Sequence, residues 1–299
     1  MSPAAALFLC LVYCRLIVDC VVCRINAYGR GPGFEPGAFG GAWTLATSVQ
    51  FAARGVSRVF HWGVADAAKL DSAGHSLYWA NGWVMAAARK IGCMAANVSV
   101  LTTAVSDTLA QQSYGASAPT GDVCANTTAS GIGGPLSNST GGVGLLIAVF
   151  SQRKDCSNRT TVSVTFQCPA SKSPARVQLM VLNETTSVYG QIHRHARNEG
   201  WLSFPDDGEI YPLLGPAVSM LTPAGLAGVK ASAPHWLEMQ RQLFTMRDLD
   251  GEGDNVRVVR NGGGDGVCAL EFRASPPAVI ALRVEFSEQD REGVISKAV

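Results

Sequence analysis

The sequence has few charged residues and no excess of either sign. Lys and Arg number 24, Asp and Glu number 23, and charged residues make up 16% of the 299 residues. Proteins that bind nucleic acid through its phosphates carry a basic stripe or patch, so this balance argues against nucleic acid as a partner. Hydrophobic residues, at 47%, are plentiful enough for a large core.

The sequence also lacks an uninterrupted apolar run long enough to span a membrane. Range 1–23 begins apolar, but Arg15 and Asp19 interrupt it, and a spanning helix needs about 20 nearly uncharged residues. We predict a signal-like or anchor-like segment over 1–23, with membrane contact only if residues 4–23 act as an anchor. The alternative is that LIVDCVVCRINAYG is a strand buried on both faces, because such strands are continuous in Val, Ile and Leu.

Outside the first 23 residues, the sequence also lacks sets of Cys and His residues at the spacings typical of metal ligands. Four of the nine cysteines lie in the first 23 residues, and the other five show neither a CxxC pair nor a His at zinc spacing. His193 and His195 would share one face of the predicted strand SVYGQIHRHA, without a third ligand. The acidic DLDGEGD stretch has Val259 where a calcium loop needs a bidentate Glu. We therefore predict no metal and no cofactor.

The chain contains five sequons for N-glycosylation. Their density favours a glycoprotein of the secretory pathway, extracellular or lysosomal. The alternative is that a Ser/Thr-rich region produces sequons by chance. The five acceptors are Asn97, Asn126, Asn138, Asn158 and Asn183.

A secretory chain can form disulfides. Cys156 with Cys168, on either side of one predicted strand, and Cys93 with Cys124 are plausible pairs. Sequence alone does not fix the connectivity.

The residues before the middle of the chain alternate between helix and strand patterns. Apolar residues at helical spacing predict a helix over 42–54 that ends at Gly55, and VSRVFHWGV then reads as a buried strand. A second helix is predicted from Trp79 to Ile91, and NVSVLTTAV is a further strand candidate. Range 24–115 is thus α/β in character.

The composition changes twice after that. Range 116–142 is rich in Gly, Ser, Thr and Asn and predicts a linker or surface loop. Range 143–286 then predicts a β-sandwich with one inserted helix, at about 234–247, because strand-like runs alternate with polar turns. The strand-like runs are VGLLIAVFSQ, TTVSVTFQC, ARVQLMVLN, SVYGQIHRHA, VCALEFRA and AVIALRVEF. Range 287–299 is polar and predicts a frayed tail.

With this order in view, the chain resembles α-L-iduronidase-like enzymes of glycoside hydrolase family 39. NRTTVSVTF, VQLMVLNETTSVYGQIHRH, LLGPAVSMLTPAGLAGVKASAPHWLEMQRQLF and PPAVIALRVEF resemble the β-sandwich that follows the barrel in that family. Residues 38–64 resemble the last helix and last strand of its (β/α)8 barrel. The resemblance implies a truncated barrel remnant followed by an antiparallel β-sandwich.

The resemblance also implies a retaining O-glycosidase, which uses two carboxylates. The family's acid/base follows an Asn-Glu pair on the fourth barrel strand. The Asn-Glu pairs here, at 183–184 and 198–199, lie far beyond the barrel-like region, so we expect the acid/base to be missing. In the family the nucleophile lies at the end of the seventh barrel strand, and Glu35 is the only carboxylate near that position, so Glu35 is the candidate nucleophile. The alternative is that Glu35 is a solvated loop residue.

The resemblance likewise places candidate sugar contacts at a strand end. His61 and Trp62 end the predicted barrel strand, with Asp66 shortly after, and strand C-termini face the site in this fold. The alternative for His61 and Trp62 is a packed strand end.

The length of the chain limits how much of a catalytic barrel it can contain. A full barrel takes roughly 200 to 400 residues, and about 110 precede the predicted linker. We expect a glycoside hydrolase-like protein acting on a glycan, inactive alone because it is a fragment or has lost the catalytic barrel. The alternative is a secreted, non-catalytic β-sandwich protein that binds carbohydrate or protein.

Overall fold

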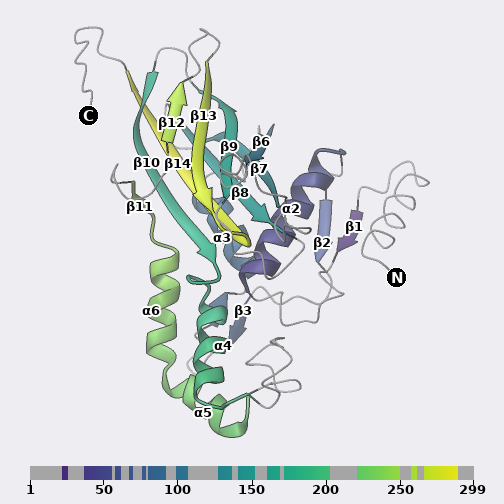
Figure 1. Ribbon diagram of the computed structural model, residues 1–299, viewed down its shortest axis with the longest axis vertical. Helices are drawn as coiled ribbons and strands as arrows, with labels where there is room; N and C mark the ends of the chain where they lie inside the picture. Colours follow the sequence, from purple (N-terminus) through teal and green to yellow (C-terminus); the bar gives the residue numbers. More distant parts are fainter. Residues whose placement is uncertain are drawn as a thin grey trace, which may run out of the picture.

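The computed structural model combines two antiparallel sheets with helices at one face and at one end (Figure 1). It describes residues 22–25, 37–55, 58–61, 67–69, 76–78, 80–91, 99–106, 127–136, 141–151, 160–168, 172–202, 221–249, 257–260 and 266–288.

The larger sheet has six strands and the smaller has four, and all neighbours within both are antiparallel. The six-stranded sheet runs in the order β11 (Arg247–Asp248), β10 (Lys172–Asn183), β14 (Ala278–Glu288), β8 (Gly142–Phe150), β7 (Thr128–Pro135) and β5 (Ser99–Val100). The four-stranded sheet runs β12 (Arg257–Arg260), β13 (Val267–Ala274), β9 (Thr160–Gln167) and β6 (Thr102–Ser106). The predicted antiparallel, mostly β C-terminal part is confirmed.

Alternation of side chains explains how the two sheets share a core. On β9, Val162, Val164 and Phe166 are buried at every second position. They pack with alternate residues of β8, β13 and β14, such as Ile147 on β8. We call the two sheets and this shared core the sandwich.

Strand β8 is buried on both faces, which is why its sequence is an unbroken apolar run. Leu145, Ile147 and Val149 face the sandwich core, while Leu146 and Ala148 belong to a second core. Successive side chains of a strand point to opposite faces, so one strand contributes to both cores.

The second core lies between the six-stranded sheet and two helices, α2 (Ala38–Ala52) and α3 (Ala80–Lys90). Small residues bring the helices close. A Cβ added at Gly41 would lie 2.9 Å from Ala80 Cβ and 3.1 Å from Leu182 Cδ2. Both helices were predicted, but as parts of the barrel-like range 24–115. Their packing partners are strands of the range 143–286, so the two ranges share a core.

Strand β1 (Val22–Ile25) pairs in parallel with β2 (Arg58–His61), and α2 connects them in the chain. Figure 1 shows this pair at the right-hand edge. The order strand, helix, parallel strand is the unit of α/β folds. Strand β1 lies within LIVDCVVCRINAYG, the stretch for which a buried strand was the alternative to a signal-like or anchor-like segment. A short antiparallel pair follows, β3 (Ala67–Lys69) with β4 (Ser76–Tyr78). Among the described residues no barrel closure is seen.

Part of the range 116–142, predicted as a linker or loop, is a strand, and this corrects that prediction. Strand β7 occupies 128–135 between β8 and β5. Its glycines are needed for close packing, not for a turn. A Cβ on Gly133 would lie 2.8 Å from Leu145 Cδ2 and 2.9 Å from Leu101 Cδ2. Likewise, β14 extends to Glu288, into the range predicted to fray; residues 289–299 lie outside the described part.

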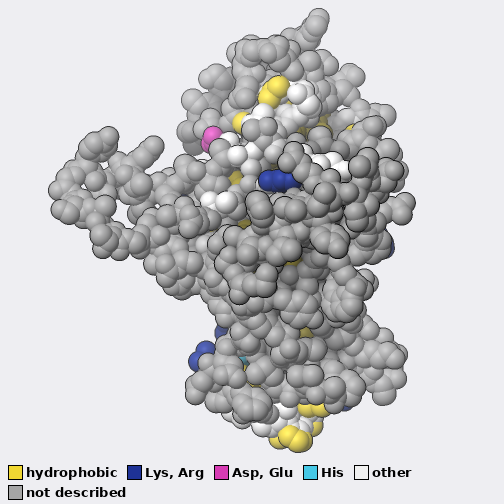
Figure 2. All heavy atoms as spheres, turned by 90° about the vertical axis from the view of Figure 1, so that its right-hand side faces the viewer, with side chains coloured by type: hydrophobic (Ala, Val, Ile, Leu, Met, Phe, Trp, Pro, Cys, Tyr) yellow, Lys and Arg dark blue, Asp and Glu magenta, His cyan; other side chains and the backbone are white. Residues whose placement is uncertain are grey.

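Three helices form what we call the cap: α4 (Val188–Asn198), α5 (Pro223–Ala231) and α6 (Ala233–Leu243). They pack together with Leu77 around a third core, below the sheets in Figure 1. Figure 2 shows hydrophobic side chains at the lower tip of the molecule, where α5 lies and Pro223, Ala224 and Ala227 are exposed.

The prediction of a strand at SVYGQIHRHA is wrong, because this segment is α4. Ser187 caps the helix by accepting a hydrogen bond from the Gly190 amide. The buried residues then recur at helical spacing, at Val188, Ile192 and Ala196. An N-cap serine followed by this period was the signal for a helix. The helix predicted at about 234–247 is confirmed as α6.

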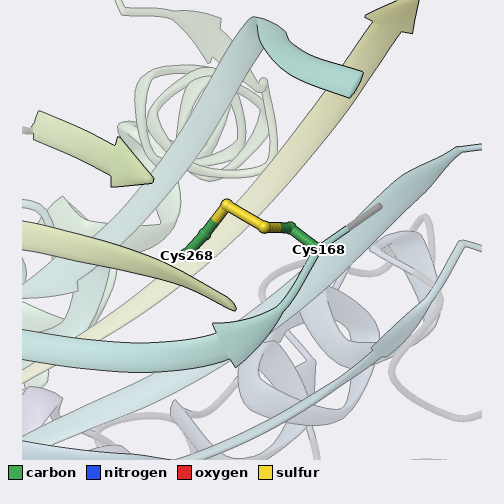
Figure 3. Close-up of a disulfide and its surroundings, with 2 residues drawn as sticks. All are labelled: Cys168 and Cys268. Atoms are coloured by element: carbon green, nitrogen blue, oxygen red, sulfur yellow. A yellow bond between two sulfur atoms is a disulfide. The ribbon is translucent and has the colours of Figure 1, made fainter. Parts of the chain in front are cut away.

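The structure also corrects one predicted disulfide. Cys168 is bonded to Cys268, with a Cα–Cα distance of 5.8 Å, and not to Cys156 (Figure 3). The bond joins β13 to the residue that follows β9. These strands are neighbours in the sheet, with Phe166 opposite Cys268, so pairing across the sheet brought the sulfurs together. Cys93, Cys124 and Cys156 lie outside the described residues.

Candidate functional site

A cavity of about 590 Å³ opens at the end of the sandwich, beside the C-terminal end of α6. Its walls come from β10, β13 and β14, from the turn after β10, and from α6 and the segment that runs from α6 into β11. The lining residues are Leu179, Met180, Val181, Asn183, Thr185, Thr186, Met239, Gln242, Leu243, Thr245, Arg247, Phe272, Arg273, Ala274, Ser275, Ala278, Ile280 and Leu282.

The cavity has an apolar side that belongs to the sandwich core. Leu179, Phe272 and Leu282 are almost wholly buried and line it from three different strands. They lie there because strand alternation directs them between the sheets. The apolar side is therefore part of a rigid, packed scaffold.

The polar members of the lining come from the turns, the strand ends and the end of α6 around that scaffold. They carry hydroxyl, amide and guanidinium groups, and most are exposed. The polar members are Asn183, Thr185, Thr186, Gln242, Thr245, Arg247, Arg273 and Ser275. Small-molecule sites combine an apolar wall with a few polar groups in the same way, at volumes of about 300–1,000 Å³.

Asn183 organises one edge of the cavity. Its Oδ1 accepts hydrogen bonds from the backbone amides of Thr185 and Thr186, each at 2.9 Å, and from the Thr185 hydroxyl at 2.7 Å. This is an Asx turn, in which an asparagine side chain stands in for a backbone carbonyl. Thr186 in turn donates its hydroxyl to the Val181 carbonyl at 2.8 Å. The edge of the cavity is thus fixed by hydrogen bonds.

The charge of the lining is positive. Arg247 and Arg273 line the cavity, and its described lining contains no Asp or Glu. The neighbouring Asp248 is engaged elsewhere: Arg176 donates to both carboxylate oxygens, at 2.7 and 2.9 Å. That hydrogen bonding holds the pKa of Asp248 below its ordinary value. Asp248 is therefore ionised and paired, and the two lining guanidinium groups favour an anionic ligand.

Most of the residues predicted for a glycosidase site lie outside the described residues. These are Glu35, Trp62 and Asp66, and with them the acceptors Asn97, Asn126, Asn138 and Asn158. His61 is the last residue of β2, paired with Ile25 of β1, and only its backbone is described. Strands β1 and β2 are parallel, so their C-terminal residues, Ile25 and His61, lie at the same edge of the pair.

Asn183 is the one predicted acceptor that the structure describes. It ends β10 and is half-buried, and the turn after it exposes Glu184 and Thr185. Sequence reasoning treated it only as a sequon and missed the cavity beside it. The run of Asn, Thr and Thr after a strand was the available signal, since these residues favour hydrogen-bonded turns.

The two histidines of the HRH motif do not share a face, because they lie on the helix α4 two residues apart. His195 packs edge-on against Trp201, with ring centroids 5.1 Å apart. Burial is the main cause that lowers the pKa of His193, with Arg197 and Arg194 adding to it. Within the described ranges no cluster of His, Cys, Asp and Glu could hold a metal ion, and no helix among them has the length and hydropathy to cross a membrane.

No protein-family model, curated protein or solved structure matches this chain. The resemblance to the iduronidase-like family therefore depends on the sequence segments quoted above.

Proposed function

We propose that this protein is a non-catalytic, secreted β-sandwich protein that binds an acidic glycan in the cavity at the end of the sandwich. The observation that carries the proposal is the composition of the cavity lining. Two arginines and six hydroxyl or amide side chains surround an apolar wall in a volume of about 590 Å³. A guanidinium group can donate two parallel hydrogen bonds to a carboxylate or sulfate, and hydroxyl and amide groups suit sugar hydroxyls.

Binding without hydrolysis follows from the same lining. A glycosidase of the retaining or inverting kind needs a pair of carboxyl groups about 5 to 9.5 Å apart across the scissile bond. The described lining of the cavity offers none, and the carboxylate of Asp248, next to the lining residue Arg247, is held by Arg176. Arginines orient a bound anion but supply no proton to a leaving oxygen at neutral pH, because their pKa exceeds about 12.

A second candidate is that the chain is the C-terminal part of a glycoside hydrolase-like enzyme. The observation that favours it is the parallel pair β1 and β2 with α2 between them in the chain. This order is the repeating unit of a (β/α)8 barrel. In this candidate Glu35 would be the nucleophile and His61, Trp62 and Asp66 would contact the sugar.

Calorimetric titration with tetragalacturonate separates the first proposal from a general affinity for sugars. Neutral galactotetraose with the same linkages is the matched control, since it differs only in carrying a hydroxymethyl group in place of each carboxylate. We expect binding of the acidic oligosaccharide at least about tenfold tighter, the gain from about one charge-assisted hydrogen bond. Equal affinities, or none, would contradict the proposal.

Substitutions in the cavity lining test whether the oligosaccharide binds in this cavity. Arg273→Ala should weaken tetragalacturonate binding by about tenfold, and Arg273→Lys by less. Lys230→Ala, which removes an exposed charge from α5, should leave the affinity unchanged. For the second candidate, turnover of an aryl glycoside that Glu35→Gln abolishes would favour an enzyme, and we expect no turnover.

A further inference from the structure

We propose that Asn183 carries an N-linked glycan that competes with free glycan for the sandwich cavity. The inference rests on the proposed function, because it concerns the regulation of that same site. Two independent features meet at this residue. Asn183-Glu184-Thr185 is a sequon, and both Asn183 and Thr185 line the cavity.

The hydrogen bonds of the turn leave the acceptor nitrogen available. Asn183 Oδ1 accepts from Thr185 and Thr186, so the plane of the carboxamide is fixed. Within the described part of the chain, Nδ2 makes no hydrogen bond, and it is not among the buried polar atoms that lack a partner. Solvent therefore reaches Nδ2, and a substituent there would break no hydrogen bond of the fold.

The modification is a simple group transfer from a lipid pyrophosphate-linked oligosaccharide. Nδ2 loses one proton and bonds to C1 of the first sugar. The bond between C1 and the pyrophosphate oxygen breaks, and the lipid pyrophosphate leaves with the electron pair. The product keeps the carboxamide Oδ1, so the turn to Thr185 and Thr186 remains intact.

Tethering places the first sugars at the edge of the cavity. A group held by a short linker reaches an effective concentration in the millimolar range. A tethered glycan that enters the cavity even weakly therefore competes with a free ligand. We expect removal of the Asn183 glycan to tighten tetragalacturonate binding by about tenfold.

The experiment compares protein secreted from eukaryotic cells with the same protein made in bacteria. Mass spectrometry of the peptide that contains Asn183 should show a glycan in the secreted protein, and an unmodified Asn183 overturns the inference. The secreted protein should bind tetragalacturonate about tenfold more weakly than the bacterial protein. Equal binding by both overturns the inference but leaves the proposed function standing, whereas no binding by the bacterial protein overturns both.

Variants assign the effect to this one glycan. Asn183→Gln and Thr185→Ala both remove the sequon, and in secreted protein each should bind as tightly as its bacterial counterpart. Thr185→Ser keeps the sequon and should retain the tenfold difference. Because each variant is compared with its own bacterial form, any direct effect of the substitution on the lining or on folding cancels. A difference that survives in both sequon-free variants would overturn the inference.

Discussion

The cores that stabilise the sandwich and the cap differ in size and in the side chains that form them. The sandwich core is shared among many branched side chains of moderate size, at alternate positions of four main strands. The cap core is smaller and depends on a few large rings, above all Tyr189 and Trp236, with Trp201 packed at its edge. Among the described residues, Leu243, at the end of α6, borders both the cap core and the core under α2 and α3.

From the separate core of the cap we predict that the cap opens on its own. A part of a protein can unfold locally when it has its own core and makes few contacts with the rest of the protein. The cavity lies where the two regions meet, with β10 and β14 on one side and the end of α6 on the other. Its apolar wall should thus be rigid, while its α6 side should be the more mobile.

The largest effect should come from the cap core. Trp236→Ala removes a buried indole and should cost about 3–5 kcal/mol. Hydrogen exchange should accelerate in α4 and α6 and stay unchanged in β8 and β14. A uniform acceleration would contradict an independent cap. Trp236→Phe is the matched control, and it should cost less than about 1.5 kcal/mol, because the indole N–H has no hydrogen-bond partner in the described residues.

Loss of the disulfide should affect the sandwich instead. Cys168 and Cys268 are separated by 100 residues in sequence, and a bond closing so long a loop stabilises by about 2–4 kcal/mol. The double variant with alanine at both positions should lower the free energy of global unfolding in a denaturant titration. Local opening of the cap should keep its rate, and a faster opening of α4 would argue that the regions are coupled.

A smaller effect is expected from Gly133→Ala in β7. The added methyl would meet Leu145 and Leu101 at under 3.0 Å, and overpacking of this kind costs about 1–3 kcal/mol. Thr128→Ala, at an exposed position of the same strand, should change the unfolding free energy by less than about 0.5 kcal/mol. Equal effects in the two variants would show that the glycine is not needed for packing.

The smallest effect should be a pH dependence of the cap. Burial lowers the pKa of His193 in the folded protein, so the folded state binds fewer protons than the unfolded state just below the ordinary pKa of about 6.5. The stability of the cap should be complete above that pH and should fall as the pH is lowered through it. His193→Gln should remove this dependence in exchange measurements at pH 7.5 and 5.5. An unchanged slope would exclude His193 as its source.

Sequence patterns predicted the sandwich well and the cap in part. Strong alternation, as in β9, and continuous apolar runs, as in β8, leave few other structures open. Strand β7 was missed because Gly131 and Gly133 carry no hydrophobic signal, and their role depends on Leu101 and Leu145, which are distant in sequence. Helix α4 was misassigned because its aromatic and β-branched residues also favour strands, and the Ser187 cap was not weighed against them.

The candidate site was less predictable. Asn183 was identified by its sequon, but the cavity brings together residues from four strands, a turn and the end of α6. No local pattern links Arg247 and Arg273, because Arg247 lies on β11 of the six-stranded sheet and Arg273 on β13 of the four-stranded sheet. They line one cavity only because the two sheets pack together. Glu35 and Trp62, chosen by resemblance, stay predictions.

The most direct test of the account is to map tetragalacturonate onto the folded protein by NMR. Backbone amide shifts should change on titration in the segments that line the cavity, at 183–186, 245–247 and 273–275, and should stay constant in β2 and α5. Shifts confined to the segments after β1 and β2 would contradict a binding site in the sandwich and favour the barrel-like edge. A spectrum that does not change at millimolar oligosaccharide would contradict the proposed function itself.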